Sequence, residues 1–260
     1  MKQFIKTYWK TLLFFVLVGL VGGFFVGFYT LNTLSADMQE QLIISVKEAG
    51  LDILPIHILL AIVTSIQSAG YGLILGALGI WLGKKTGLWK DERDIQKKPL
   101  LVTLLAALFG GLMLILPDLL FFGKYSQVIL DSYATKPTFD YILASVTYGG
   151  VIEEVMLRLF MMSLVTFLLH KLFEKGKDTP STTIYIIANA ISALLFAAGH
   201  LPATVMMIGT TPLIIFRCFL LNGAFGYLFG WLYHKYGLRY AMICHAGCHL
   251  VSKLIWILFI

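Results

Sequence analysis

Several ionisable side chains lie inside long apolar segments of the C-terminal half of the sequence, where charged groups are rare, and six of them could take part in chemistry. They are Glu153, Glu154, Arg158, His200, His245 and His249. An ionisable group within an apolar, membrane-spanning segment is costly, so such groups normally pair with one another or take part in function. Carboxylates and imidazoles are also the side chains that most often transfer protons in hydrolysis. The six residues are therefore candidates for a buried hydrolytic site.

Helical spacing separates the two neighbouring carboxylates. Glu154 and Arg158 are four residues apart in the favoured acid-before-base order, and an ion pair between them would offset part of their burial cost. Glu153 lies about 100° further round a helix and five residues from Arg158, so it faces another way. It is thus the carboxylate without a local partner and the candidate general base. The alternative is a purely structural Glu–Glu–Arg cluster that locks helix packing.

The two C-terminal histidines, His245 and His249, are also four residues apart and share one helix face. This is the spacing of the two zinc-binding histidines in an H-E-x-x-H helix. Here Ala246 follows the first histidine, so the glutamate base of that motif is missing and would have to come from Glu153. The alternative is that these histidines are simply hydrogen-bonded within the bundle.

The composition defines the surroundings of these residues. The chain has 260 residues, of which 58% are hydrophobic and 13% are charged, and its mean hydropathy is +0.84. Soluble domains are about 45–50% apolar and about 25% charged. So few charges cannot cover the surface of a soluble protein of this size, which excludes a soluble enzyme, a disordered chain and a nucleic-acid binder. The chain is expected to be an all-α, polytopic membrane protein.

About seven segments reach the roughly 20 apolar residues that a spanning helix needs. They cover residues 11–30, 55–83, 100–122, 141–169, 183–200, 212–233 and 240–260. All the candidate residues fall in the last four. We therefore expect residues 1–138 to form a framework of transmembrane helices and residues 139–260 to form the catalytic helical core.

Basic residues between these segments predict the orientation. Fourteen of the 20 Lys and Arg residues fall on one side of a seven-span arrangement: Lys2, Lys6, Lys10, Lys84, Lys85, Lys90, Arg93, Lys97, Lys98, Lys171, Lys175, Lys177, Lys235 and Arg239. Only Lys47, Lys124 and Lys136 fall on the other side, among acidic residues. Because cytoplasmic loops carry the excess of basic residues, the N-terminus is expected to be cytoplasmic.

The depths of the candidate residues do not agree on this span assignment. Glu153 and His245 are expected nearer the cytoplasmic face, whereas His200 ends the fifth span, 183–200, near the outer face. For the three to meet, the fifth helix must begin well below the membrane, or the helices must dip unequally round a cavity.

Three motifs in order resemble one known family. E-E-x-x-x-R at Glu153, F-x-x-x-H at Phe196 and an H-x-x-x-polar helix at His245 resemble the CPBP family. These are intramembrane proteases related to the CAAX prenyl endopeptidase, and they include bacteriocin-processing and immunity proteins. The resemblance covers about residues 140–252.

The resemblance implies a division of labour. Glu153 and His200 would activate water, and His245 and His249 would stabilise the oxyanion on the opposite side. The family usually has Asn where this chain has His249, so His249 could donate a hydrogen bond, bind a metal or mark a divergent or inactive member. If all four residues bound zinc, they would fill a tetrahedral site and leave no position for water. We therefore expect metal-free chemistry, with zinc as the alternative cofactor.

The leading functional hypothesis is an intramembrane endopeptidase that cleaves a peptide or membrane-protein substrate within the lipid bilayer, in a bacterial cytoplasmic membrane. The alternative is a non-catalytic bacteriocin-immunity or scaffold protein. A small transporter with Glu153 as a proton relay is a third possibility, but the sequence lacks the inverted repeats of many transporters. No nucleic-acid partner is expected, and the substrate and oligomeric state remain open.

The alternation of basic residues predicts where reporters will lie. A reporter fused after Lys98 should be cytoplasmic, and one fused after Lys136 should be external, because an odd number of spans separates them. Phosphatase and fluorescent-protein fusions at the two positions measure this. Signals on the same side for both fusions would contradict the seven-span assignment.

Overall fold

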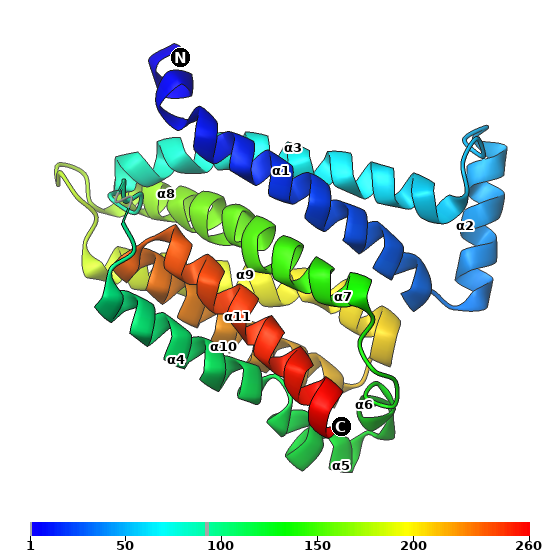
Figure 1. Ribbon diagram of the computed structural model, residues 1–260. Helices are drawn as coiled ribbons and strands as arrows, with labels where there is room; N and C mark the ends of the chain where they lie inside the picture. Colours follow the sequence, from blue (N-terminus) through cyan, green and yellow to red (C-terminus); the bar gives the residue numbers. More distant parts are fainter. Residues whose placement is uncertain (1, 92–93) are drawn as a thin grey trace.

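The computed structural model describes residues 2–91 and 94–260, and these residues form helices with no strand (Figure 1). Arg93, one of the basic residues in the predicted cytoplasmic loop, lies outside the described residues. Six of the described helical segments are long and apolar enough to cross a membrane: α1 (Lys2–Thr33), α3 (Ile56–Thr86), Lys97–Tyr125, α9 (Thr182–Ile208), α10 (Pro212–Tyr236) and α11 (Leu238–Phe259). The predicted all-α membrane bundle is confirmed.

The third of these segments is built from several pieces. It begins as α4 (Lys97–Met113) and continues through a turn into η1 (Asp118–Phe122) and α5 (Gly123–Tyr125). A short helix, α6 (Gln127–Asp131), then leads towards the middle of the chain.

A further helical segment carries the paired glutamates and corresponds to the predicted fourth span. It runs without a break through α7 (Phe139–Ala144), η2 (Ser145–Glu153), η3 (Val155–Met162) and α8 (Ser163–Phe173). The two central pieces are π-helices, in which hydrogen bonds join residues five apart instead of four. We call this segment the middle helix. The sequence analysis expected ordinary α-helical winding here, and π-winding is frequent at functional sites.

The middle helix lies between two groups of helices. Helices α1 and α3 pack along each other on one side of it, and α9, α10 and α11 lie on the other (Figure 1). Piece η2 contacts α1 and α11, whereas η3 contacts α3 and α9. Helix α4 packs against α11 on the far side from α1 and α3. The glutamates are therefore surrounded by helices from both halves of the sequence.

One helix was missed in the sequence analysis. Residues between the first two spans form α2 (Ala36–Glu48), which stands across the ends of α1 and α3 in Figure 1. The Ser35 side chain caps it by accepting a hydrogen bond from the Met38 backbone N–H at 3.3 Å. With 13 residues it is too short to span a membrane. None of its residues is buried, so the sequence has no apolar core face that would indicate a helix here.

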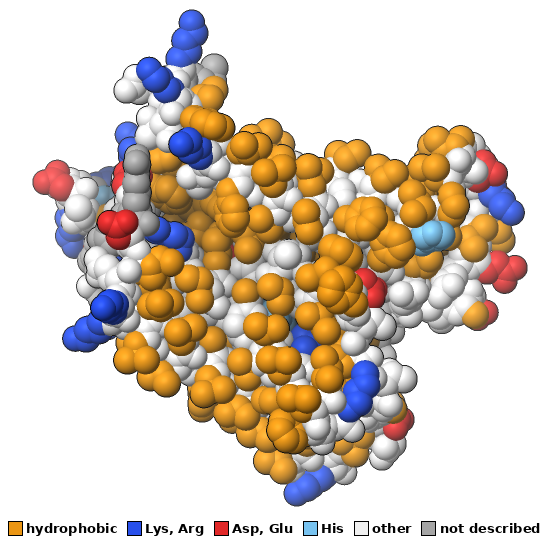
Figure 2. Space-filling model, in the orientation of Figure 1, with side chains coloured by type: hydrophobic (Ala, Val, Ile, Leu, Met, Phe, Trp, Pro, Cys, Tyr) orange, Lys and Arg blue, Asp and Glu red, His pale blue; other side chains and the backbone are white. Residues whose placement is uncertain are grey.

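Side-chain types are distributed as a membrane protein requires. Figure 2 shows hydrophobic side chains covering the middle of the molecule, with lysines, arginines and acidic residues concentrated at its ends. Large apolar side chains are exposed along the sides of the helices, for example Phe14, Leu105 and Phe109. The protein is an integral membrane protein, and its polar interior is the exception to be explained.

Glycines allow α1 and α3 to approach closely. The Thr64 hydroxyl donates a hydrogen bond across the pair to the Gly23 carbonyl at 2.6 Å, and the Ser65 hydroxyl donates to the Leu20 carbonyl at 2.8 Å. A Cβ atom on Gly23 would overlap the Thr64 backbone carbonyl. Because the neighbour is backbone, it cannot rotate away.

Two further pairs of glycines, each four residues apart, also mark close packing. Gly72 and Gly76 lie against Phe15 of α1, and Gly226 and Gly230 of α10 lie against Ala193 and Asn189 of α9. A Cβ on any of the four would crowd the facing helix.

A buried ion pair fixes the end of the molecule near the C-terminus. Arg217 of α10 donates through two nitrogens to Asp118, which is fully buried, and the Tyr133 hydroxyl donates to the same carboxylate at 2.8 Å. Asp118 is thus inside the protein and neutralises Arg217, which lies 99 residues further along the chain.

The start of α9 is fixed by the loop that precedes it. The Glu174 carboxylate accepts hydrogen bonds from the Lys177 ammonium and the Ser181 backbone N–H, each at 2.9 Å. These hydrogen bonds, with that of Lys177 the largest cause, hold the pKa of Glu174 below its usual range. The loop thereby anchors the helix that carries His200.

Two glycine substitutions test the packing of α1 on α3. Gly23→Ala should lower the stability of the protein by about 1–3 kcal/mol, because the added methyl group forces two backbones apart. Gly70→Ala is the matched control, since nothing lies within 4 Å of its Cβ position. It should be neutral or slightly stabilising, because alanine favours helices. Thermal unfolding in detergent measures both, and equal melting temperatures would contradict the packing.

Candidate active site

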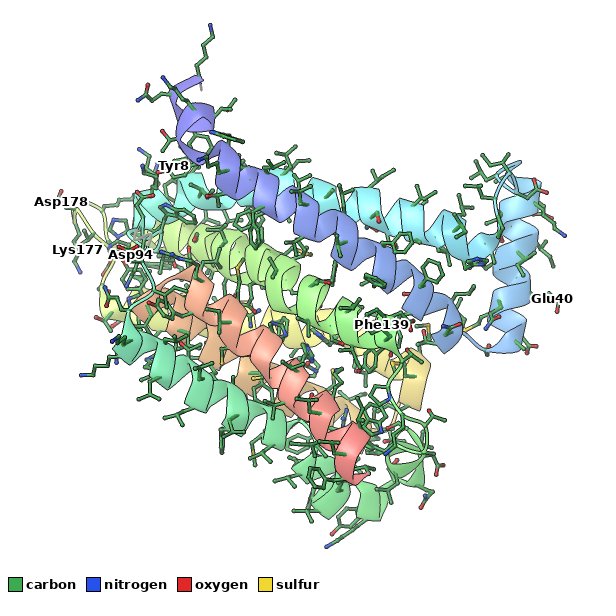
Figure 3. All side chains as sticks on the ribbon, in the orientation of Figure 1. Tyr8, Glu40, Asp94, Phe139, Lys177 and Asp178 are labelled. Atoms are coloured by element: carbon green, nitrogen blue, oxygen red, sulfur yellow. The ribbon has the colours of Figure 1, made fainter. Side chains whose placement is uncertain are left out.

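The four candidate catalytic side chains meet between the middle helix, α9 and α11. Glu153 Oε2 lies 4.0 Å from His200 Nε2 and 3.9 Å from His245 Nε2. The rings of His245 and His249 have centroids 4.9 Å apart. Figure 3 draws the side chains on the ribbon and labels Phe139 at the start of the middle helix, the segment that carries Glu153.

The His249 ring lies against Gly149 of the middle helix and faces the same space. A Cβ atom on Gly149 would lie 3.1 Å from His249 Nε2 and 3.9 Å from Glu153 Oε2. Both groups therefore face one small region in front of Gly149. The absence of a side chain at this position leaves room for the histidine ring.

The position of His200 corrects a predicted boundary. The fifth span was expected to end at His200, but α9 continues to Ile208 through Pro202. His200 is thus inside the helix and not at its end. The predicted end of this span was wrong by eight residues, and His200 nevertheless lies 4.0 Å from Glu153. Proline often ends a helix, which made the true end hard to see in the sequence.

Glu154 is the centre of a fully buried cluster. Its Oε1 atom accepts a hydrogen bond from His245 Nδ1 at 2.8 Å and lies 3.1 Å from Arg158 Nη1. Glu154 and Arg158 both have no exposed surface. Arg158 also donates through Nη2 to the Gly226 carbonyl of α10 at 3.1 Å. One carboxylate therefore links the middle helix to α11 and, through arginine, to α10.

Two phenylalanines complete the surroundings of this cluster. The Arg158 guanidinium lies 4.3 Å from the Phe196 ring centroid and 5.3 Å from that of Phe229. The His245 ring stacks on Phe229 with centroids 4.4 Å apart. Aromatic faces attract cations, so the rings help to stabilise a buried guanidinium. Phe196, the first residue of the F-x-x-x-H motif, thus serves both Arg158 and His200.

Hydrogen bonds assign the protons on two imidazoles. His200 Nδ1 lies 2.9 Å from the Phe196 carbonyl, which can only accept, so Nδ1 carries the proton. His245 Nδ1 likewise donates to the Glu154 carboxylate. In the neutral rings, both Nε2 atoms therefore present lone pairs towards Glu153.

Glu153 has no such partner. Among the described residues, its Oε2 atom is buried and accepts no hydrogen bond. A buried, unpaired carboxylate oxygen facing two imidazole lone pairs is unfavourable as a purely structural arrangement. The same arrangement provides two neighbouring acceptors for the protons of a water molecule.

The distances fit zinc poorly. Ligands of tetrahedral zinc at 2.0–2.1 Å stand about 3.3 Å from one another, whereas Glu153 Oε2 is 3.9 and 4.0 Å from the two imidazole nitrogens. Within the described residues, no group of three or more His, Cys, Asp or Glu side chains has the geometry to hold a metal ion. The arrangement of these residues therefore does not fit a tetrahedral zinc ion.

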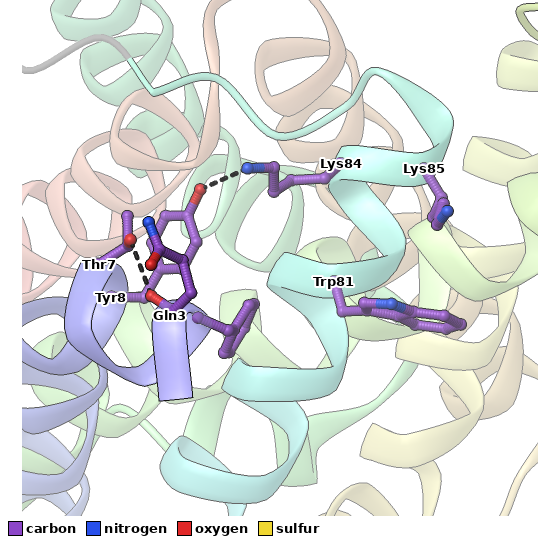
Figure 4. Close-up of a pocket in the computed structure, with 7 residues that line it drawn as sticks. Gln3, Thr7, Tyr8, Trp81, Lys84 and Lys85 are labelled. Atoms are coloured by element: carbon purple, nitrogen blue, oxygen red, sulfur yellow. Dashed lines mark hydrogen bonds between the residues drawn. The ribbon is translucent and has the colours of Figure 1, made fainter. Parts of the chain in front are cut away.

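One surface cavity lies away from this site. It has a volume of about 310 Å³ and lies between α1 and α3, where Thr7, Tyr8, Trp81 and Lys84 line it (Figure 4). The Lys84 ammonium donates to the Tyr8 hydroxyl at 2.8 Å across it. None of the candidate catalytic residues lines this cavity.

Sequence reasoning missed one residue beside the site. Lys253 of α11 is only 5% exposed, and its Nζ lies 3.4 Å from His249 Nδ1. It follows His249 by four residues, as His249 follows His245, so the three form one row on a helix face. That spacing was the available signal.

Comparison with known proteins supports the family resemblance. Residues 135–251 match the family model described as type II CAAX prenyl endopeptidase Rce1-like. This segment is an Rce1-like domain. The matched range contains all six candidate residues and ends before Lys253. No curated protein and no solved structure matches the chain. The Rce1-like domain supports a membrane-embedded protease of the CAAX type in general.

Removing one charge of the buried Glu154–Arg158 pair should lower the stability of the protein more than removing both charges together. Arg158→Ala leaves Glu154 as a buried, under-compensated charge, and should lower stability by about 3–5 kcal/mol. The double variant Glu154→Gln, Arg158→Met should lose less, since it buries no charge at these positions. Thermal unfolding in detergent compares the two. Wild-type stability in Arg158→Ala would contradict the ion-pair interpretation.

Proposed function

We propose that the protein is an intramembrane endopeptidase that hydrolyses a peptide bond in a peptide or membrane-protein substrate. The observation that carries this proposal is Glu153 Oε2, buried without a hydrogen-bond partner among the described residues and faced by two imidazole nitrogens. It lies within the Rce1-like domain. Glu154 Oε2 also has no hydrogen-bond partner among the described residues, but the other oxygen of Glu154 is bonded to His245 and paired with Arg158, whereas Glu153 faces two imidazole nitrogens.

Glu153 and His200 would activate the water. Their facing atoms are 4.0 Å apart, so one water molecule can donate a hydrogen bond to each. Glu153 takes one proton as general base, and the water oxygen forms a bond to the scissile carbonyl carbon. His200 holds the other proton and orients the attack.

His249 and His245 would stabilise the negative charge that develops on the carbonyl oxygen. For His245 to donate from Nε2 it must be an imidazolium, since Nδ1 already donates to Glu154. The ionised Glu154 stabilises that form, as a carboxylate does for a catalytic imidazolium. Collapse of the intermediate breaks the C–N bond, and Glu153 returns its proton to the leaving amine.

The scaffold alternative rests on Glu154, whose contacts would lock three helices without any catalysis. It leaves Glu153 unexplained, because a lock needs only one carboxylate. We therefore favour the endopeptidase over an immunity or scaffold protein. A bacterial cytoplasmic membrane, a cytoplasmic N-terminus and metal-free chemistry belong to the same proposal.

A substrate-trapping experiment tests the proposed function. Glu153→Gln should abolish cleavage while leaving the protein folded, because the amide cannot accept the proton and strands no partner charge. Uncleaved substrate should then accumulate in membranes and co-purify with the variant, where mass spectrometry identifies it. Glu40→Gln, an exposed position on α2, is the matched control and should behave as wild type.

Two outcomes would overturn the proposal. Substrate turnover by Glu153→Gln at the wild-type rate would exclude Glu153 as the base. Stoichiometric zinc in the purified protein, with activity lost on chelation and restored by zinc, would replace metal-free chemistry with a metalloprotease.

A further inference from the structure

Lys253 is a buried cation that the proposed mechanism does not use. It is 5% exposed, and within the described residues it forms no ion pair with a carboxylate. Its contacts are His249 Nδ1 at 3.4 Å and the face of the Tyr141 ring, whose centroid is 4.3 Å away. A lysine inside a membrane protein is expensive and needs a reason.

The contact with His249 has a direction. A lysine ammonium has three donors and no acceptor, so it can only donate to His249 Nδ1. Nδ1 must then present its lone pair, and the ring proton of neutral His249 lies on Nε2. This is the opposite tautomer to that of His200 and His245, whose protons are on Nδ1.

The tautomer determines what His249 offers to the site. Its Nε2 atom faces the space in front of Gly149 that Glu153 Oε2 also faces. With the proton on Nε2, His249 donates a hydrogen bond into that space. With the proton on Nδ1, it would offer a third imidazole lone pair beside a carboxylate, and no neutral histidine would be a donor.

We propose that Lys253 is a positioning residue that holds His249 in the Nε2–H tautomer and so makes it an oxyanion donor. This inference rests on the proposed function and adds a residue to it. It also separates His249 from any zinc ligand set, because a protonated Nε2 cannot bind a metal.

The charges at the site agree with this role. Two carboxylates, Glu153 and Glu154, and two cations, Arg158 and Lys253, are present, so the site is neutral with neutral imidazoles. Arg158 pairs with Glu154. The Tyr141 face partly replaces the solvation that the Lys253 ammonium loses on burial.

The test compares Lys253→Met in two backgrounds, wild type and His249→Asn. In the wild-type background, Lys253→Met should lower kcat by up to about 100-fold, which is the loss expected when one oxyanion donor is removed, with little change in KM. In His249→Asn it should cost little, because the amide donates without help from lysine. Lys253→Arg, which keeps a donor, should retain the wild-type rate. An equal loss from Lys253→Met in both backgrounds would make Lys253 merely structural and overturn the inference.

A spectroscopic measurement keeps the test independent of activity. Nitrogen-15 NMR of histidine-labelled protein in bilayers reports which ring nitrogen carries the proton, and His249 is assigned by its absence in His249→Asn. The wild type should show His249 protonated on Nε2, and Lys253→Met should show a mixture of tautomers. If no substrate is cleaved, the proposed function fails, while this spectrum still decides the role of Lys253. His249 protonated on Nδ1 in the wild type would refute it.

Discussion

The hydrogen bond and ion pair made by one buried carboxylate hold the site together. Glu154 is held by Arg158 of the same helix and by His245, 91 residues away in the sequence. In apolar surroundings, removing either the carboxylate or the guanidinium leaves the other as an unpaired buried charge, which costs several kcal/mol. The middle helix, α10 and α11 must therefore pack so that these groups meet, and the positions of the other polar residues follow.

This constraint gives two adjacent glutamates different chemistry. Glu154 is committed to the framework, and its bond to His245 Nδ1 fixes the ring that faces Glu153. Glu153, one residue earlier, points to the other side and has no hydrogen bond to its Oε2 among the described residues. Paired residues of one type are thus divided by environment into a structural and a reactive member, and the reactive member is held against histidines from two other helices.

The spacing of residues in the sequence predicted part of this arrangement. The contacts between distant segments could not be predicted from it. The four-residue separation of Glu154 and Arg158 indicated their proximity, and the order of motifs indicated which helices carry the site. The bond from Glu154 to His245 depends on packing between distant segments, and the π-winding of the middle helix has no simple sequence signal. His200 was misplaced because Pro202 resembles a helix end. Lys253 was overlooked although its spacing from His249 follows the same four-residue rule.

The ionisation of Glu154 is the central physical claim, and infrared difference spectroscopy measures it directly. The comparison is between wild-type protein and Glu154→Gln in bilayers at neutral pH, with Glu40→Gln as the exposed reference. An ionised Glu154, matched by Arg158 and hydrogen-bonded by His245, predicts that the substitution removes a carboxylate stretching band. Loss of the carbonyl band of a protonated carboxylic acid would show that Glu154 is neutral, and would contradict the account of how the site is held together.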